Sequence, residues 1–282
     1  MIRFKKRARI YLIYNKIKML TIIITHHQTP VLLKLCLKSI IENIEDIEYE
    51  IIIADSQTES VVKDLIEKKM FKEMKIKLIS FSKNVGYAKL VNVAIESANG
   101  NNILILNADI LILKGSIQKM IDFMKDNPQT GIIGPQLLTF SNKIQNSYFK
   151  FPTLGAILAR RTFLGKLKWG KKKLNKFLMQ EEDSISKKVD WVQGSAMFVR
   201  KEAIDKVGLM DERYFMYLED TDWCRRFWQN DYEVICLPSA KMSHYYYRVS
   251  KKWNSFLDVL FNKYARIHLI SAFKYFWKWR KV

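Results

Sequence analysis

The chain has 282 residues, of which 49% are hydrophobic and 13% aromatic. This supply of apolar side chains is enough for a sizeable core, so intrinsic disorder is excluded as the dominant state. The net charge of +20 predicts an anionic partner, such as a nucleic acid, a phosphate-bearing substrate or a membrane surface.

The positive charge is concentrated in three segments. Residues 1–18 carry seven Lys and Arg, and residues 159–180 carry eight, with no acid in either segment. Residues 248–282 carry nine bases and one acid, while the rest of the chain has a net charge of −3. We therefore expect a basic N-terminal extension (1–18), a globular domain (19–247) and a basic C-terminal tail (248–282).

The sequence predicts a protein without disulfides or membrane spans. Cys36, Cys224 and Cys236 are too few and too scattered for a disulfide framework, which fits a reducing cytosol. The longest uncharged stretch, Asn127–Asn142, is broken by Pro and Gly and is shorter than the ~18 to 20 apolar residues of a spanning helix. The basic start lacks the apolar core of a signal peptide.

From Leu20 onward, short β-branched runs alternate with amphipathic stretches of helical length, which predicts an α/β fold around a parallel sheet. The four runs are unbroken and apolar, as is typical of strands buried on both faces. The expected strands are Thr21–Thr25, Tyr49–Ala54, Ile76–Ser80 and Ile103–Leu106. Three helices are expected: one that begins at Pro30, one from about Glu59 to Met70, and one from Gly86 to Ser97.

After Ser116 the alternation is less regular, so we divide the domain into a nucleotide-binding half (19–115) and a second half (116–247). The expected elements of the second half are a helix to about Asn127, strands at Ile132–Leu138 and Trp191–Val199, a helix at Glu219–Asn230, and strands at Glu233–Leu237 and Lys241–His244. Beyond Lys251, helical spacing predicts amphipathic helices; the apolar residues there include Trp253, Phe256, Leu257, Leu260, Phe261, Tyr264 and Ile267.

Polar side chains follow each of the first four expected strands. Ligands of doubly wound sheets bind beyond the carboxyl ends of the strands, so these positions predict a site. Taken singly, an acid could cap a helix and a glycine could supply a positive φ. The positions are Thr25-His26-His27, Asp55, Asn84-Val85-Gly86-Tyr87 and Asn107-Ala108-Asp109.

A denser acidic cluster stands at an expected helix start and comprises Glu219, Asp220 and Asp222. The helix dipole favours acids there, so capping is one interpretation. Three carboxylates are more than a cap requires. A base, or a group that faces a metal or a sugar hydroxyl, is the other interpretation.

Seven segments in this order resemble the motifs of glycosyltransferase family 2, in particular its bacterial rhamnosyltransferase-like branch. They are Leu20–Pro30, Glu50–Ser60, Asn84–Ala94, Ile103–Ile112, Val189–Arg200, Val207–Arg226 and Ala240–His244. The resemblance implies a GT-A fold, with a mostly parallel central sheet flanked by helices. It also implies an inverting, metal-dependent transfer of a sugar from a nucleoside-diphosphate sugar to a cell-surface glycan or lipid-linked acceptor.

The resemblance also assigns the donor site. Asp55 would read the nucleotide base, with Thr25 against the same base. Asp109 would hold Mg²⁺ or Mn²⁺ on the donor diphosphate, and His244 would complete the metal shell; a hard divalent cation prefers carboxylate oxygen. The further donor residues implied are Gly86, Asn92 and Asn107, the last of which stands where an acid is expected.

For the acceptor, the resemblance makes Asp220, paired with Glu219, the general base that deprotonates the hydroxyl. The residues implied for the sugar and acceptor pocket are Trp191, Gly194 and Asp222. Rhamnose linked to dTDP is the favoured donor. A UDP-hexose is the alternative, because an aspartate accepts from the N3–H of uracil or thymine equally well.

The basic segments predict where the protein works. Trp and Phe among Lys and Arg in the tail suit an anionic lipid interface, which implies a cytoplasmic protein peripheral to the inner face of the cell membrane. Packing of the tail on the domain or on a second subunit in a homodimer is the alternative. A non-catalytic basic protein that binds nucleic acid or membrane is the competing class, but no nucleic-acid module is present, so we expect no nucleic-acid partner.

Overall fold

The computed structural model describes residues 19–161, 163–179, 185–245 and 262–280. The expected basic extension at 1–18 lies outside the described residues, and so do the apolar tail positions from Trp253 to Phe261.

The first half alternates strands and helices as the sequence predicts. Its elements are β1 (Leu20–His26), α2 (Pro30–Asn43), β2 (Tyr49–Ser56), α3 (Ser60–Ile66), β3 (Ile76–Phe81), α4 (Tyr87–Glu96) and β4 (Asn102–Asn107). Pro30 is the first residue of α2. The N–H groups of a helix's first turn have no acceptor within the helix, so the N–H that proline lacks costs no hydrogen bond. The sequence predicted that the second helix runs from about Glu59 to Met70. This end was wrong, because α3 ends at Ile66 and turns follow.

A short strand, β5 (Ile110–Ile112), ends the first half. The elements of the second half are α5 (Ser116–Asp126), β6 (Thr130–Leu138), β7 (Ile144–Gln145), β8 (Tyr148–Phe149), α6 (Leu154–Arg161), the 3₁₀ helix η1 (Phe163–Lys166), α7 (Lys168–Leu178), β9 (Lys187–Lys188), β10 (Trp191–Val192), β11 (Ala196–Arg200), α8 (Lys201–Val207), α9 (Glu219–Gln229) and β12 (Glu233–His244). The basic segment 159–180 thus contributes to helices, and the two last expected strands form one.

The main sheet has the order β3-β2-β1-β4-β11-β6-β12-β5, with β7 and β9 attached beside β6 and β12. β1 to β4 are parallel, whereas β11 runs antiparallel between β4 and β6. The expectation that all four early strands are buried on both faces was wrong for β3. This strand lies at the sheet edge, where Lys77 and Ser80 are exposed.

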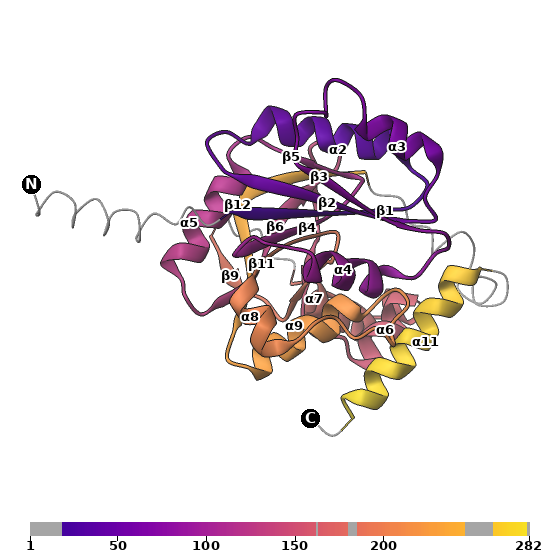
Figure 1. The fold of residues 1–282 in the computed structure, drawn as a ribbon. Coiled ribbons are helices and arrows are strands. Elements are labelled where there is room, and N and C mark those ends of the chain that lie inside the picture. Colours follow the sequence, from indigo (N-terminus) through magenta and orange to yellow (C-terminus); the bar gives the residue numbers. More distant parts are fainter. Residues whose placement is uncertain (1–18, 162, 180–184, 246–261, 281–282) are drawn as a thin grey trace, which may run out of the picture.

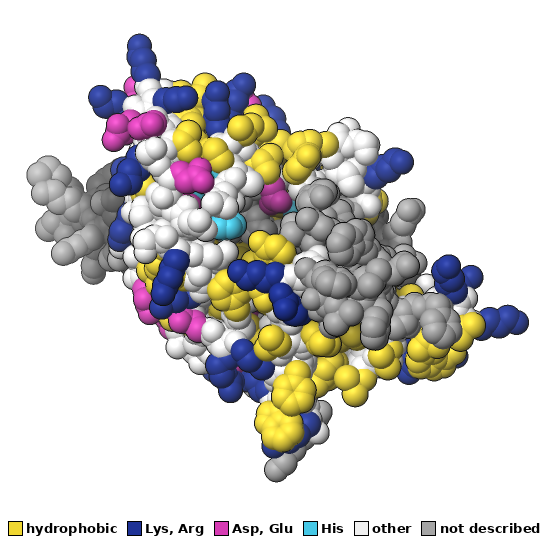
Figure 2. All heavy atoms as spheres, turned by 90° about the vertical axis from the view of Figure 1, so that its right-hand side faces the viewer, with side chains coloured by type: hydrophobic (Ala, Val, Ile, Leu, Met, Phe, Trp, Pro, Cys, Tyr) yellow, Lys and Arg dark blue, Asp and Glu magenta, His cyan; other side chains and the backbone are white. Residues whose placement is uncertain are grey.

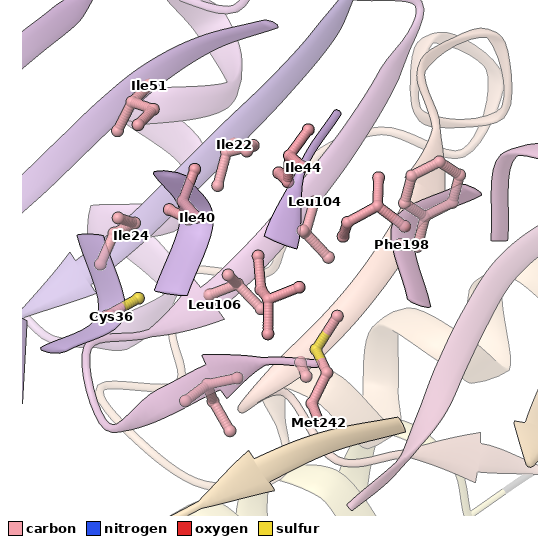
Figure 3. Packing of buried hydrophobic residues seen from close by; sticks show 14 of the residues in the cluster. Ile22, Ile24, Cys36, Ile40, Ile44, Ile51, Leu104, Leu106, Phe198 and Met242 are labelled. Carbon is pink, nitrogen blue, oxygen red and sulfur yellow. The ribbon is translucent and has the colours of Figure 1, made fainter. Parts of the chain in front are cut away.

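Helices cover both faces of the sheet (Figure 1). On one face, α2, α3 and α5 cover a cluster that includes Leu37, Ile40 and Met120, and part of this packing is shown in Figure 3. On the other face, α4, α8 and α9 cover a second cluster that includes Val91 and Trp223. The site positions at the strand ends are therefore held by a sheet packed from both sides.

The C-terminal helix α11 (Lys263–Lys278) lies against the second half of the domain (Figure 1). Ala272, Tyr275 and Trp279 form a small buried cluster with Tyr214 and Leu218. One face of the tail thus packs on the domain, as one of the alternatives from the sequence proposed. In the described parts of the chain, no helix combines the length and apolar character needed to cross a membrane.

The junction between the parallel and antiparallel parts of the sheet gives a test of the core. Phe198 of β11 is fully buried between Leu104 of β4 and Ile133 of β6. We predict that Phe198→Ala lowers the free energy of unfolding by about 3 to 5 kcal/mol, because it removes buried area and leaves a cavity. Urea unfolding followed by circular dichroism measures this. Phe140→Ala, at a half-exposed position, should change it far less, and equal losses would contradict the assignment.

Candidate functional site

The strand register brings the expected donor residues to one edge of the sheet. His26 of β1 pairs with Asp55 of β2, and Thr25 pairs with Asn107 of β4. The Thr25 hydroxyl donates to Asn107 Oδ1 over 3.0 Å, and Thr25 O accepts from the amide of Ala108 over 3.0 Å. Three separate segments of sequence are therefore joined where the parallel strands end.

Asp55 is paired with His26, a strand-end residue to which the sequence assigned no specific role. His26 Nδ1 lies 2.7 Å from Asp55 Oδ1, and His26 Nε2 accepts from the amide of Thr29 over 3.0 Å. Since Nε2 accepts, the proton is on Nδ1 and is donated to the carboxylate. Both side chains are buried, and Asp55 Oδ2 has no partner among the described residues.

Asp109 and His244 lie together, as the resemblance implies. Pairing of β5 with β12 sets His244 opposite Ile110, and His244 Nε2 is 3.5 Å from Asp109 Oδ2. The amide of Gln145 lies 2.9 Å from His244 Nδ1 and fixes the ring. Asp109 Oδ1 is buried and has no hydrogen-bond partner in the described part of the chain.

This pair of side chains fits a divalent cation. No group of three or more His, Cys, Asp or Glu within the described ranges could hold a metal. Mg²⁺ sites commonly use one or two protein ligands and complete the shell with water and substrate phosphates. Asp109, with its unpaired oxygen, and His244, oriented by Gln145, would supply the protein ligands of such a shell.

The expected strand Trp191–Val199 is interrupted, and the acidic cluster contacts the backbone at the interruption. The backbone leaves the ladder at residues 193–195, and there the amide of Gly194 donates to Asp220 Oδ2 over 2.9 Å. The amide of Thr221 donates to Asp220 Oδ1 over 2.7 Å. Gly194 is suited to this position, because an added Cβ would lie 3.3 Å from the Asp220 Cβ and from the Tyr87 ring.

Tyr87 lies among the carboxylates; the sequence placed it at the end of the third strand but assigned it no role. Its hydroxyl donates to the carbonyl of Gly194. Burial and the negative charges of Glu219, Asp220 and Asp109 raise the pKa of Tyr87 well above its ordinary value. Tyr87 is therefore a neutral hydrogen-bond donor that contacts the same backbone segment as Asp220.

The two acids at the start of α9 differ in their surroundings. Burial, and then the charge of Asp220, raises the pKa of Glu219 well above its ordinary value, and Glu219 Oε2 has no partner among the described residues. Burial also raises the pKa of Asp220, but the amides of Gly194 and Thr221 oppose this shift. Asp220 is therefore the acid that the site keeps in hydrogen-bonded, ionisable form.

Gly86 and Asn92 support the loop that precedes α9. Gly86 has φ of +87°, and a Cβ there would lie 2.5 Å from Phe215 O. Asn92 is buried and bonds the amide and carbonyl of Met210 over 2.9 Å each. Both residues thus shape the site through the backbone of residues 210–215.

Two expected pocket residues have other partners. Trp191 is stacked on Phe149 and donates to Lys150 O, so it lies in the core. Asp222, which the resemblance places in the acceptor pocket, is completely buried, and its carboxylate accepts from Lys278 and Trp279, on and just after α11. Spacing on α9 could not reveal this, because both partners lie more than fifty residues away.

Comparison with solved structures confirms the class of fold, that of GT-A nucleotide-sugar transferases. The crystal structure of GalNAc-T7 with UDP, GalNAc and Mn²⁺ is similar to this chain with a TM-score of 0.64 and 13% identity. The similarity covers 82% of this chain and 43% of that one.

The family follows from the sequence. The family model "Glycosyl transferase family 2" matches residues 21–208, so the chain belongs to this family. Its sequence is 29% identical over 184 residues to the N-acetylglucosaminyl-diphospho-decaprenol L-rhamnosyltransferase of Mycobacterium tuberculosis (strain H37Rv), across 60% of this chain and 59% of that protein. It is 26% identical to rhamnosyltransferase WbbL of Escherichia coli (strain K12), across 85% and 87%. These relatives confirm the resemblance to the rhamnosyltransferase-like branch.

The buried Glu219 predicts a pH-dependent stability. A carboxyl whose pKa is raised by folding contributes stability that is complete below its unfolded pKa, near 4.5, and is lost as pH rises through the raised folded value. We predict that Glu219→Gln, which cannot ionise, raises the free energy of unfolding at about pH 8 and flattens its decline from about pH 5. Urea unfolding across this range measures it. Glu96→Gln, at an exposed position, should follow the unaltered protein; a parallel decline in Glu219→Gln would contradict the prediction.

Proposed function

We propose that the protein transfers a sugar, L-rhamnose in the favoured case, from a nucleoside-diphosphate sugar to a glycan or lipid-linked acceptor with inversion. The observation that carries this proposal is the meeting of Asp220 with Gly194 at the end of the sheet that also carries Asp109. The names of the rhamnosyltransferase relatives support the choice of sugar.

Asp220 would act as the general base. Burial raises the pKa of Asp220 and so makes its carboxylate a stronger base, while the amides of Gly194 and Thr221 stabilise the ionised form. The bonds from Gly194 and Thr221 orient its two oxygens. In a single displacement, the acceptor oxygen would form its bond to the anomeric carbon as its proton passes to Asp220. The bond from that carbon to the diphosphate would break, which inverts the configuration.

The donor would lie across the ends of β1, β2 and β4. A divalent cation held by Asp109 and His244 would neutralise the charge of the leaving diphosphate. Asp55 Oδ2, which has no partner in the described part of the chain, would accept the N3–H of a thymine or uracil, while His26 keeps the carboxylate oriented. Thr25 and Asn107 would complete this edge.

Substitution of the two acids tests the catalytic assignment. We predict that Asp220→Asn, which can still accept the Gly194 bond, lowers kcat by about 10² to 10⁴ through loss of the base. Asp109→Ala should abolish turnover through loss of the metal ligand. Release of nucleoside diphosphate from dTDP-rhamnose and from a panel of UDP-hexoses measures both and identifies the donor. Asp64→Asn, exposed on α3, is the control, and full activity in both site variants would refute the proposal.

We also propose that the enzyme is peripheral to an anionic membrane through two adjacent helical surfaces. On α11, the exposed apolar side chains are Leu269, Ile270, Phe273 and Trp277; on and between α6 and α7 they are Leu154, Leu158, Leu167 and Trp169. Arg225 lies over the ring of Phe151, just before α6, and over that of Trp279, which places the two surfaces beside each other. Figure 2 shows hydrophobic and basic side chains together on this side of the molecule.

Vesicle binding tests the membrane surface. Phe273→Ser with Trp277→Ser should weaken the binding to vesicles of anionic lipid, measured by sedimentation, about tenfold or more. The reason is that the substitutions remove two aromatic rings whose transfer from water to lipid would stabilise the bound state. Val31→Ser with Ile41→Ser, two exposed positions on α2, is the matched control. Unchanged vesicle binding would refute the membrane proposal. If the first variant also turned a dimer into a monomer, a second copy of the chain would be the partner of this face.

A further inference from the structure

The backbone immediately before the proposed base is held in an unfavourable conformation. Tyr217 and Leu218 have φ values of +73° and +68°, and neither is a glycine. For residues with a side chain, the left-handed region costs conformational free energy, so the surrounding structure must impose it. The next two residues are Glu219 and Asp220, so the geometry of this turn determines where the base lies.

Helix α11 contacts each of the residues Met216, Tyr217 and Leu218 in this turn. The hydroxyl of Ser271 donates to Met216 O over 2.8 Å, and the ring of His268 lies 5.0 Å from that of Tyr217. Leu218 is buried against α11. The two left-handed residues and the one before them thus each have a contact on the same helix.

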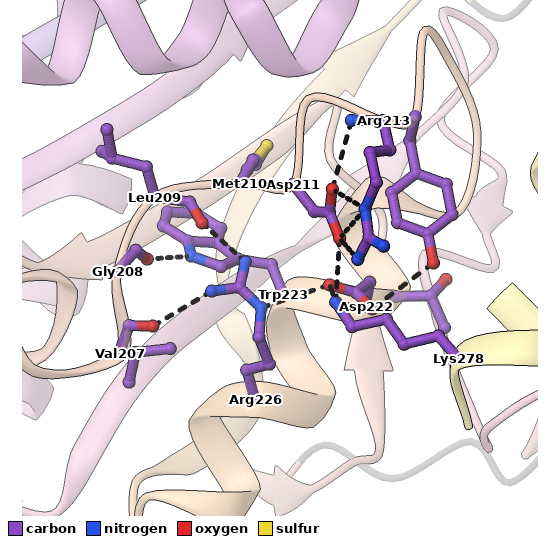
Figure 4. A network of polar contacts seen from close by, with 12 residues as sticks. Val207, Gly208, Leu209, Met210, Asp211, Arg213, Asp222, Trp223, Arg226 and Lys278 are labelled. Atoms are coloured by element: carbon purple, nitrogen blue, oxygen red, sulfur yellow. Dashed lines mark hydrogen bonds and ion pairs between the residues drawn. The ribbon is translucent and has the colours of Figure 1, made fainter. Parts of the chain in front are cut away.

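A buried charge network fastens the end of α11 to the first turn of α9. Asp222 is completely buried and receives the ammonium of Lys278 at 2.8 Å and the guanidinium of Arg226 at 3.2 Å (Figure 4). It also receives the indole N–H of Trp279 at 2.9 Å. Lys278 also reaches Asp211 at 3.0 Å, so it joins both ends of the loop 211–222. A buried carboxylate that lost these donors would be left uncompensated, which opposes separation of α11 from α9.

We propose that α11 is a brace that imposes the turn at Tyr217–Leu218 and thereby positions Asp220 for the acceptor hydroxyl. Ser271, Lys278 and Trp279 are positioning residues in this scheme, since they act through the loop and through Asp222. The brace lies beyond the segment 21–208 that the family model matches. The inference rests on the proposed function of Asp220.

The brace predicts an effect on kcat with little effect on the donor. Its bonds end on residues 211–226, whereas Asp55 and Asp109 are carried at the ends of strands packed within the sheet. Displacement of a catalytic group by as little as 1 Å can cost about 10²-fold in rate. We therefore expect Lys278→Met with Trp279→Phe to lower kcat about tenfold or more and to leave the KM for the donor within about twofold.

A glycine rescue separates positioning from general stability. Glycine adopts a positive φ without the steric cost, so adding Tyr217→Gly to the Lys278→Met, Trp279→Phe chain should restore part of the lost kcat. Asp46→Gly is the matched control, because Asp46 also has a positive φ of +57° but lies between α2 and β2. Ser271→Ala, which removes only the bond to Met216, is a milder variant of the brace in case the double substitution impairs folding.

Hydrogen exchange of the amides of residues 216–222 completes the experiment. We expect the Lys278→Met, Trp279→Phe chain to show faster exchange at these amides and a lower kcat. We expect added Tyr217→Gly, but not added Asp46→Gly, to restore part of that kcat. Faster exchange with unaltered kcat would overturn the brace, and so would a loss of kcat that both glycine substitutions restore equally or that neither restores. Failure of the proposed function is recognised separately, because Asp220→Asn would then retain full activity in the chain with an intact α11.

Discussion

The pairing of β4 with two unlike neighbours is the constraint on which the site depends. β4 runs parallel to β1 on one side and antiparallel to β11 on the other. The parallel side brings Asn107 beside Thr25, and the antiparallel side brings the start of β11 to the same edge, where the amide of Asn107 donates to Ser195 O over 2.9 Å. Gly194 precedes that contact and holds Asp220. The two halves of the domain therefore meet along this ladder, as they also do where β5 pairs with β12.

Hydrogen-bond partners distinguish the buried acid with a structural role from the acids of the site. Asp222 accepts from Lys278, Trp279 and Arg226, so its charge is compensated. Asp55, Asp109 and Glu219 each retain a buried oxygen without a partner in the described residues. Among the described residues, the buried carboxylate oxygens without a partner are thus those of the proposed site, where a ligand would supply the missing bond.

The sequence identified the parallel strands and the residues at their ends, because strands buried on both faces are continuous apolar runs and turn residues mark where they stop. It failed where long-range contacts decide the structure. The edge position of β3 depends on sheet order, and the break at residues 193–195 depends on contacts with Asp220 and Tyr87. The roles of His26 and Asp222 depend on partners that no local pattern places beside them.

The three cysteines, all buried, have a consequence for chemical labelling. Burial raises the pKa of Cys36 and of Cys236 to about 12 and that of Cys224 higher still. The thiolate is the reactive form, so the folded protein presents almost none of it near neutral pH. A cysteine introduced at an exposed position would therefore react with maleimide or iodoacetamide reagents without removal of the native thiols. Fluorophores or spin labels could then be attached at chosen points on the native background.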